Sequence, residues 1–182
     1  MRIAIIGPQN TGKTTFIQDF LREFKSYTTP KEKYRDIISK NKLKINQNTN
    51  DKSQELIGSF LFKNIKNTTG KNVVFDRCVI DNYIYSSLGY RAKKVSKDLL
   101  LKTEKLMLEN LRYLDCIVFI PTAVSVRLKA DNIRDIDTQF VDEVNDAFIT
   151  TLLDIRSKYF IPVFVISGNR KQRIEKIKRI LS

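Results

Sequence analysis

Short apolar runs alternate with longer amphipathic segments along this chain. Four runs are continuously apolar and rich in β-branched side chains, at residues 3–6, 73–75, 117–120 and 163–166. Such runs are typical of parallel strands covered on both faces. Between and after them, apolar residues recur with helical spacing at residues 16–24, 140–153 and 174–181. The alternation predicts a three-layer α/β/α sandwich around a mainly parallel sheet of roughly five strands.

The region between the first two apolar runs is more polar. Residues 40–52 are rich in Asn and Lys and separate two weaker helical patterns at residues 34–38 and 56–65. We expect a mobile surface loop there, not a domain boundary. The sequence contains no repeat and no linker rich in Pro, Gly or Ser, so residues 1–182 are expected to form a single domain.

A glycine-containing motif lies between the first apolar run and the first amphipathic segment. Its sequence GPQNTGKT, at residues 7–14, fits G-x-x-x-x-G-K-[ST], in which backbone amides before a helix cradle phosphates. Lys13 would reach the β- and γ-phosphates, and the Thr14 hydroxyl would bind Mg²⁺. A chance turn is the alternative, but the strand and helix on either side favour nucleotide binding. The expected nucleotide contacts are Gly7, Asn10, Thr11, Gly12, Lys13, Thr14 and Thr15.

The second apolar run ends in a carboxylate and a guanidinium, Asp76 and Arg77. In α/β proteins, ligands bind at the carboxyl edge of the sheet, where this strand ends. Asp76 would hold Mg²⁺ or act as a base toward an acceptor hydroxyl, and Arg77 would clamp a phosphate or orient the acceptor. Alternatively, Asp76 caps the helix that opens near Val79, and Arg77 is merely solvated. The preceding phosphate loop favours the functional interpretation.

Composition narrows the chemistry. The chain has 33 Lys and Arg against 20 Asp and Glu, a formal net charge of +13, and no His. Without His, the usual zinc sites and the common Ser-His-Asp and Cys-His hydrolase sites are excluded. The basic charge permits a nucleic-acid partner without demanding one, because nucleotide phosphates are also anionic. Six basic residues after residue 169 are interpreted mainly as a solvated helix face.

Targeting signals are not evident. No apolar run approaches the length of a membrane span, and the four apolar residues before Gly7 are too few for a signal peptide. The two cysteines, Cys78 and Cys116, cannot form a disulfide framework. We therefore expect a cytoplasmic protein with reduced thiols and no membrane partner.

Three motifs together resemble the nucleoside and nucleotide kinase branch of the P-loop proteins, which includes thymidylate kinase, deoxynucleoside kinases and ribosylnicotinamide kinase. The motifs are GPQNTGKTT, VVFDRCVIDNYIYS and DNIRDID, in this order over most of the chain. The resemblance implies a strand ending in Asp76 and Arg77. It also implies a mobile lid at residues 124–138, whose Arg134 contacts the transferring phosphoryl group. An acceptor-side helical insertion would span residues 30–66, where Glu32 and Arg35 match a Glu-x-x-Arg of small kinase-like ATPases.

The lid segment is strongly charged between residues 127 and 137, so it must lie at the surface. Closed over the phosphates, Arg134 would neutralise the charge that develops on the γ-phosphoryl group. The alternative is a solvated helix entrance with Asp137 or Thr138 as its N-cap. The order of the motifs favours the lid.

The resemblance implies an ATP- and Mg²⁺-dependent phosphotransferase acting on a nucleoside or a (deoxy)nucleoside monophosphate. The alternative, motivated by the basic charge, is a nucleic-acid-binding NTPase or a kinase of polynucleotide 5′ ends. A GTPase switch is disfavoured because the sequence lacks its Asp-x-x-Gly and Asn-Lys-x-Asp motifs, and an AAA-type motor because no segment is left for a helical lid domain. Small standalone members of this branch are common in large phage genomes, so a phage-infected host cell is also expected.

Overall fold

A four-stranded parallel sheet forms the centre of the computed structural model, which describes residues 1–122 and 138–181. The strand order is β2-β1-β3-β4. The strands are β1 (Arg2–Ile6), β2 (Val73–Asp76), β3 (Cys116–Phe119) and β4 (Val163–Val165). They coincide with the four apolar runs of the sequence. A fifth strand was expected, but within the described residues the place next to β2 holds only an isolated parallel bridge between Thr28 and Val73.

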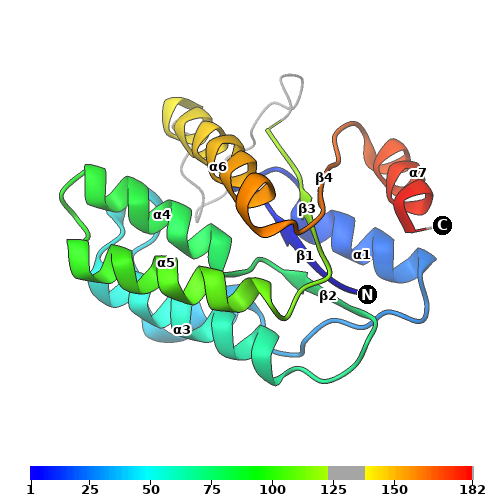
Figure 1. Cartoon of the computed structure of the whole chain (residues 1–182), viewed down its shortest axis with the longest axis horizontal. Coiled ribbons are helices and arrows are strands. Elements are labelled where there is room, and N and C mark those ends of the chain that lie inside the picture. Colours follow the sequence, from blue (N-terminus) through cyan, green and yellow to red (C-terminus); the bar gives the residue numbers. More distant parts are fainter. Residues whose placement is uncertain (123–137, 182) are drawn as a thin grey trace.

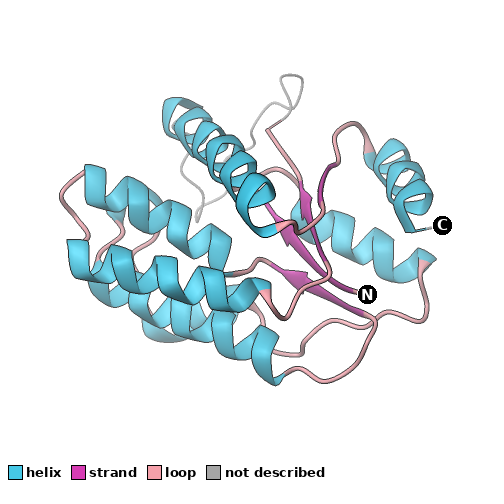
Figure 2. Cartoon of the chain, in the orientation of Figure 1, coloured by secondary structure: helices cyan, strands magenta, loops and turns pink. Residues whose placement is uncertain are grey.

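Helices cover both faces of the sheet (Figures 1 and 2). On one face lie α3 (Asp51–Asn67), α4 (Val79–Arg91), α5 (Lys97–Leu111) and α6 (Thr138–Tyr159). On the other face lie α1 (Lys13–Glu23) and α7 (Arg170–Leu181). The short helix α2 (Tyr34–Asn41) and the 3₁₀ helix η1 (Asn46–Asn48) join α1 to the larger layer. The expected three-layer α/β/α sandwich is confirmed.

Alternation along the strands produces two separate cores. In β1, Ile3 and Ile5 pack with α1 and α7, whereas Ala4 and Ile6 pack with the larger helical layer. Strands β2 and β3 alternate in the same way, because successive side chains of a strand point to opposite faces. This double burial explains why the runs are continuously apolar rather than alternating.

The strand register brings distant segments to one edge. Ile5 pairs with Asp76 of β2, and Ile6 pairs with Phe119 of β3. The loop that follows β1 and the residues that follow β2 therefore emerge together at the carboxyl edge of the sheet, where ligands bind in such folds.

Two parts of the larger layer differ from the sequence analysis. The polar stretch at residues 40–52 is more ordered than a surface loop, since it contains the end of α2, all of η1 and the start of α3. Thr49 within it is only 3% exposed and accepts a hydrogen bond from Gln54. The helix α5 had no counterpart in the sequence analysis.

Across both described stretches, no helix has the length and apolar character that crossing a membrane requires.

Candidate active site

The phosphate loop connects β1 to α1 and depends on two glycines. Gly7 has a φ of 142° and Gly12 a φ of 80°, values that side-chain-bearing residues rarely adopt. A Cβ at Gly7 would lie 2.3 Å from the carbonyl oxygen of Ile120. The turn therefore needs glycine for its conformation and for its close contact with the end of β3.

Polar atoms of this loop are available for a ligand. Both polar atoms of the Asn10 side chain and Nε2 of Gln9 are buried, yet they have no hydrogen-bond partner within the described part of the chain. Buried polar groups normally find partners, so such atoms call for a ligand or water. Together with the amides of the loop and the N-terminus of α1, they fit a polyphosphate.

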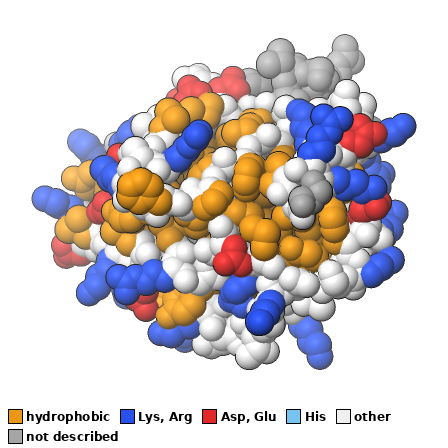
Figure 3. Space-filling view, turned by 45° about the vertical axis from the view of Figure 1, so that its right-hand side comes forward, with side chains coloured by type: hydrophobic (Ala, Val, Ile, Leu, Met, Phe, Trp, Pro, Cys, Tyr) orange, Lys and Arg blue, Asp and Glu red, His pale blue; other side chains and the backbone are white. Residues whose placement is uncertain are grey.

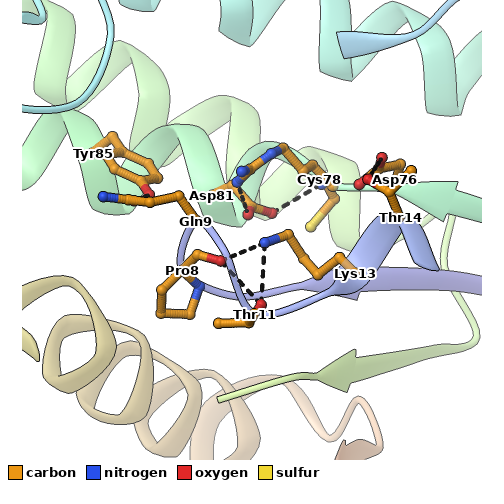
Figure 4. A network of polar contacts seen from close by, with 10 residues as sticks. Pro8, Gln9, Thr11, Lys13, Thr14, Asp76, Cys78, Asp81 and Tyr85 are labelled. Carbon is orange, nitrogen blue, oxygen red and sulfur yellow. Dashed lines mark hydrogen bonds and ion pairs between the residues drawn. The ribbon is translucent and has the colours of Figure 1, made fainter. Parts of the chain in front are cut away.

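Lys13 is folded against the loop. Its ammonium Nζ donates hydrogen bonds to the carbonyl oxygen of Pro8 and to Oγ1 of Thr11, and the residue is only 6% exposed (Figure 4). Burial, together with repulsion by Arg77, lowers the pKa of Lys13 from 10.5 to about 7. A phosphate group would replace the missing solvent and counter-charge.

Thr14 and Asp76 meet at the carboxyl edge of the sheet. The hydroxyl Oγ1 of Thr14 lies 3.4 Å from Oδ2 of Asp76, as a long hydrogen bond (Figure 4). Thr14 is exposed and Asp76 is half-buried, so both can reach a ligand. Mg²⁺ prefers hard oxygen donors and is usually bound by one or two protein oxygens together with substrate phosphates and water. This pair therefore fits Mg²⁺, although the described residues hold no cluster of three or more acidic or Cys ligands.

Arg77 lies beside the phosphate loop and is held in a strained conformation. Its φ is 76°, unusual for a residue with a side chain. Its Nη1 donates to Oδ1 of Asp81 at 2.7 Å, and its guanidinium lies 4.7 Å from the centre of the Tyr34 ring. Burial opposes the charge of Arg77, but Asp81, the neighbouring tyrosines and Asp76 together outweigh it and raise the pKa of Arg77. Backbone strain of this kind concentrates at functional sites.

The structure contradicts the alternative interpretation, in which Asp76 caps the helix after β2 and Arg77 is merely solvated. The N-cap of α4 is Cys78, not Asp76, and Asp81 satisfies this end of the helix by accepting the backbone N–H of Cys78 at 3.2 Å. The Arg77 side chain is 12% exposed, so it is not simply solvated. Cys78 is buried, which raises the pKa of its thiol and leaves it unreactive.

A narrow pocket opens next to the ion pair of Arg77 and Asp81, between α2, α3 and α4. It is lined by two aromatic rings, a charged pair, amides and aliphatic side chains, including Tyr34, Gln54, Arg77, Asp81, Asn82 and Tyr85. The Tyr85 hydroxyl donates to Oε1 of Gln9, which ties the pocket to the phosphate loop (Figure 4). The cavity volume is about 10 Å³, so the walls are nearly closed on one another.

The other expected site residues are less central. Thr15 is exposed on the first turn of α1. Arg35 is exposed on α2, close enough for its charge to lower the pKa of Lys13 further. Glu32 is exposed before α2, and among the described residues no hydrogen bond or ion pair joins it to the phosphate loop or to Asp76. Arg134 and the expected lid lie outside the described residues, apart from the lid's last position, Thr138, where α6 begins.

The basic C-terminal segment is partly occupied within the protein. Arg170 donates to both carboxylate oxygens of Asp19, at 2.8 and 2.7 Å, and Lys178 pairs with Glu23 at 2.6 Å. These contacts bind α7 to α1, which lies beside it in Figure 1. The face drawn in Figure 3 carries apolar side chains in its middle and basic ones mainly around its margin. The solvated-face interpretation is therefore only partly correct.

Sequence reasoning missed several residues of the site. Asp81, Tyr34 and Gln54 were not singled out. Only Asp81 carried a usable signal, because an acid three residues after an N-cap commonly accepts the N-cap backbone N–H. The others depend on how α2 and α3 fold back over the carboxyl edge.

Solved structures with this fold include nucleoside kinases. A deoxyadenosine kinase from M. mycoides, with the products dCMP and a flexible dCDP bound, is 19% identical and has a TM-score of 0.72, covering 100% of this chain and 98% of that chain. The same kinase with dATP bound is 15% identical with a TM-score of 0.69, covering 100% of both chains. The NadR protein in complex with NR is 14% identical with a TM-score of 0.70, covering 98% of this chain but 49% of that one. At these identities the likeness shows the fold, which this chain shares with these proteins.

Comparison of the sequence itself gives a family. No curated protein matches it significantly. A family model described as an AAA domain matches residues 2–173. The family name describes the domain and assigns no motor activity to this chain. Because the match spans nearly the whole sequence, the protein belongs to this AAA domain family of P-loop proteins.

Proposed function

We propose that this protein is an ATP- and Mg²⁺-dependent kinase that phosphorylates a nucleoside or a (deoxy)nucleoside monophosphate. The observation that supports this most is the convergence of three features at one edge of the sheet. The phosphate loop, the pair of Thr14 and Asp76, and the pocket beside Arg77 all lie there. A donor site next to a separate polar and aromatic pocket suits transfer of a phosphoryl group from ATP to a second bound molecule better than simple hydrolysis of ATP.

The donor is assigned to the phosphate loop. The loop amides and Asn10 bind the phosphates, and Lys13 exchanges its contact with the Pro8 carbonyl for the β- and γ-phosphates. Thr14 and Asp76 would hold Mg²⁺, which supplies charge neutralisation for the phosphates. Their oxygens lie 3.4 Å apart, close enough to bind one metal ion together.

The acceptor is assigned to the pocket between α2, α3 and α4. Tyr34 and Tyr85 offer ring faces for a nucleobase, and Gln54 and Asn82 offer amide groups for its polar edge. Asn82 now donates to the side chain and carbonyl oxygens of Gln54, at 2.6 and 2.9 Å. A cavity of about 10 Å³ has room for about one water molecule, so an acceptor requires α2 and η1 to move outward.

Transfer joins the two sites. An oxygen of the acceptor attacks the γ-phosphorus, the bond to the β-phosphate oxygen breaks, and ADP leaves. A hydroxyl acceptor gives its proton to solvent or to Asp76, whereas a phosphate acceptor is already ionised. Arg77 and Arg35 offset repulsion between the two substrates, and Arg134 is proposed to act on the moving phosphoryl group from the lid.

The second candidate, a polynucleotide 5′-end kinase or nucleic-acid-binding NTPase, rests on the net charge of +13. Part of that charge is already engaged, since Arg170 and Lys178 pair with acidic residues of α1. The acceptor pocket is also narrow rather than an open basic groove. We therefore favour the small acceptor.

The experiment is an acceptor panel with γ-³²P-labelled ATP and Mg²⁺, comparing nucleosides, nucleoside monophosphates and 5′-hydroxyl oligonucleotides. Labelled product from a nucleoside or a monophosphate is expected, and Lys13→Ala should abolish it while the protein stays folded. Label transferred only to oligonucleotides would favour the second candidate. Release of free phosphate alone, or full activity in folded Lys13→Ala, would contradict the proposal.

A further inference from the structure

Arg173 of α7 reaches from the C-terminal helix to the phosphate loop. It is only 8% exposed. Its Nε donates to the carbonyl oxygen of Gly168 at 2.8 Å, and its Nη1 donates to the carbonyl oxygen of Thr11 at 2.8 Å, across 162 residues of sequence. The guanidinium thus joins the turn after β4 to the turn after β1. Nothing in the sequence pattern distinguished Arg173 from the other basic residues of this helix.

The Arg173 charge lacks an acidic partner, unlike two of its neighbours. Arg170 and Lys178 form ion pairs with Asp19 and Glu23. Among residues 1–122 and 138–181, no carboxylate forms an ion pair with Arg173, and burial lowers its pKa. A guanidinium remains charged in proteins, so its burial is unfavourable until an anion compensates it. The phosphate loop beside it is the place where an anion would bind.

The contact with Thr11 also fixes a peptide of the loop. The carbonyl oxygen of Thr11 and the N–H of Gly12 belong to the same planar trans peptide and point in opposite directions. When Arg173 holds that carbonyl, the N–H of Gly12 must point away from α7. The fit is close, since a Cβ at Gly12 would lie 3.3 Å from Nη1 of Arg173.

We propose that Arg173 is a positioning residue for the phosphate loop, which orients the Thr11–Gly12 peptide toward the bound triphosphate and whose charge strengthens the binding of the phosphates. The inference rests on the first step of the proposed function, triphosphate binding, and on no assumption about the acceptor. It predicts that the effect of Arg173 is carried by the phosphates of the ligand and not by its base.

The test measures binding without an acceptor. Arg173→Gln is compared with wild type for Mg²⁺–ATP by calorimetry, and for inorganic tripolyphosphate by competition. Arg170→Gln is the matched control, because it removes another guanidinium that joins α7 to α1 but does not touch the phosphate loop. Arg173→Lys keeps the charge and the aliphatic stem, and serves as the second variant if Arg173→Gln does not fold.

Arg173→Gln should weaken ATP and tripolyphosphate by the same factor, about 10- to 100-fold, as expected for charged hydrogen bonds. Arg170→Gln should change either affinity by less than about 3-fold, because its ion pair is on the surface. Arg173→Lys should recover part of the lost affinity, because one ammonium cannot replace a two-pronged guanidinium.

Two results for the variants would overturn the inference. Equal losses in Arg173→Gln and Arg170→Gln would show that Arg173 only holds α7 in place. Loss of ATP affinity with unchanged tripolyphosphate affinity would show that it acts on the nucleoside. A wild-type protein that binds ATP but phosphorylates no acceptor would contradict the proposed function and leave this test intact, whereas one that binds neither triphosphate would contradict both.

Discussion

Oγ1 of Thr14 lies 3.4 Å from Oδ2 of Asp76, although 62 residues separate them in the sequence. Thr14 is placed by the first turn of α1, and Asp76 by the end of β2. The pairing of Ile5 with Asp76 sets this approach, because it brings the end of β2 beside the start of the phosphate loop. The proposed metal position is therefore a consequence of the strand register.

Shared use of a metal predicts that the two side chains act as a unit. Thr14→Ala and Asp76→Asn should each lower kcat by about 10²- to 10³-fold at ordinary Mg²⁺ concentration, and the double variant should lose much less than the product of the two effects. Kinetics over a range of Mg²⁺ concentrations would measure this. Multiplicative losses with an unchanged Mg²⁺ requirement would contradict a shared metal and favour Asp76 as the base.

Lys13 should make the stability of the unliganded protein depend on pH. Its pKa is about 7 in the folded protein and 10.5 in the reference state. Between these values the unfolded chain binds the extra proton, so the free energy of unfolding should rise as the pH increases from about 7 to about 10. Below about pH 7 both states are protonated, and the unfavourable burial of the charge is fully present.

Lys13→Met removes this group and provides the comparison. Near pH 6, the unfolding free energy of the variant should exceed that of wild type by about 3–5 kcal/mol. This difference between the two proteins should narrow as the pH rises. Urea denaturation at several pH values measures it. A gap that stays constant or widens with pH would show that Lys13 is not buried as described.

The ion pair between Arg77 and Asp81 should be strongly coupled, because both side chains are largely buried. Arg77→Met and Asp81→Asn should each destabilise the fold by about 3 kcal/mol, and the double variant by much less than the sum. Asparagine keeps an oxygen for the Cys78 N–H, so this substitution removes mainly the charge.

A matched control for that pair lies on α6. Lys158 and Asp154 also stand four residues apart, at 2.8 Å, but both are more than half exposed. Their coupling energy should be no more than about 0.5 kcal/mol. Equal coupling in the two pairs, measured by double-mutant cycles in urea, would mean that burial does not strengthen the Arg77–Asp81 pair.

Gly7 should tolerate substitution less well than another glycine with positive φ. Gly70 has a φ of 107°, and a Cβ there would meet only Cγ2 of Val73 at 3.6 Å. Gly70→Ala should therefore cost about 1–2 kcal/mol from backbone strain alone. Gly7→Ala adds the clash with the Ile120 carbonyl and should cost at least about 3 kcal/mol in thermal or urea unfolding. Similar losses at both positions would argue against the close contact.

The strands β1, β2 and β3 could be predicted because their apolar runs have a single physical explanation, burial on both faces, whereas β4 lies at the sheet edge with Val165 exposed. All four runs became strands, and the phosphate loop lies where its flanking pattern placed it. The fifth strand could not be excluded in advance, since Thr28 does pair with Val73 but over one residue only. Helix α5 was missed because its apolar positions are interrupted by many charged residues.

Contacts between segments distant in sequence account for what the sequence could not predict. The sequence of the C-terminal helix indicated a solvated basic face. In the structure, Arg173 is buried against Thr11, and Arg170 pairs with Asp19. The apolar periodicity predicts which face of α7 packs. It does not predict which carbonyl or carboxylate oxygens of α1 and the phosphate loop lie opposite the basic side chains of α7. The position of α2 beside the pocket formed with α3 and α4 could not be predicted either, because α2 contains no buried residue.

Calorimetric titration of Mg²⁺–ATP into the protein at about pH 8, in two buffers of different ionisation enthalpy, tests the central claim most directly. Free Lys13 is then largely neutral, and the triphosphate should restore its charge. We predict binding of one ATP per chain with uptake of up to one proton, and loss of that uptake in Lys13→Met. Absence of any binding by folded protein, or binding with the same proton uptake in Lys13→Met, would contradict it.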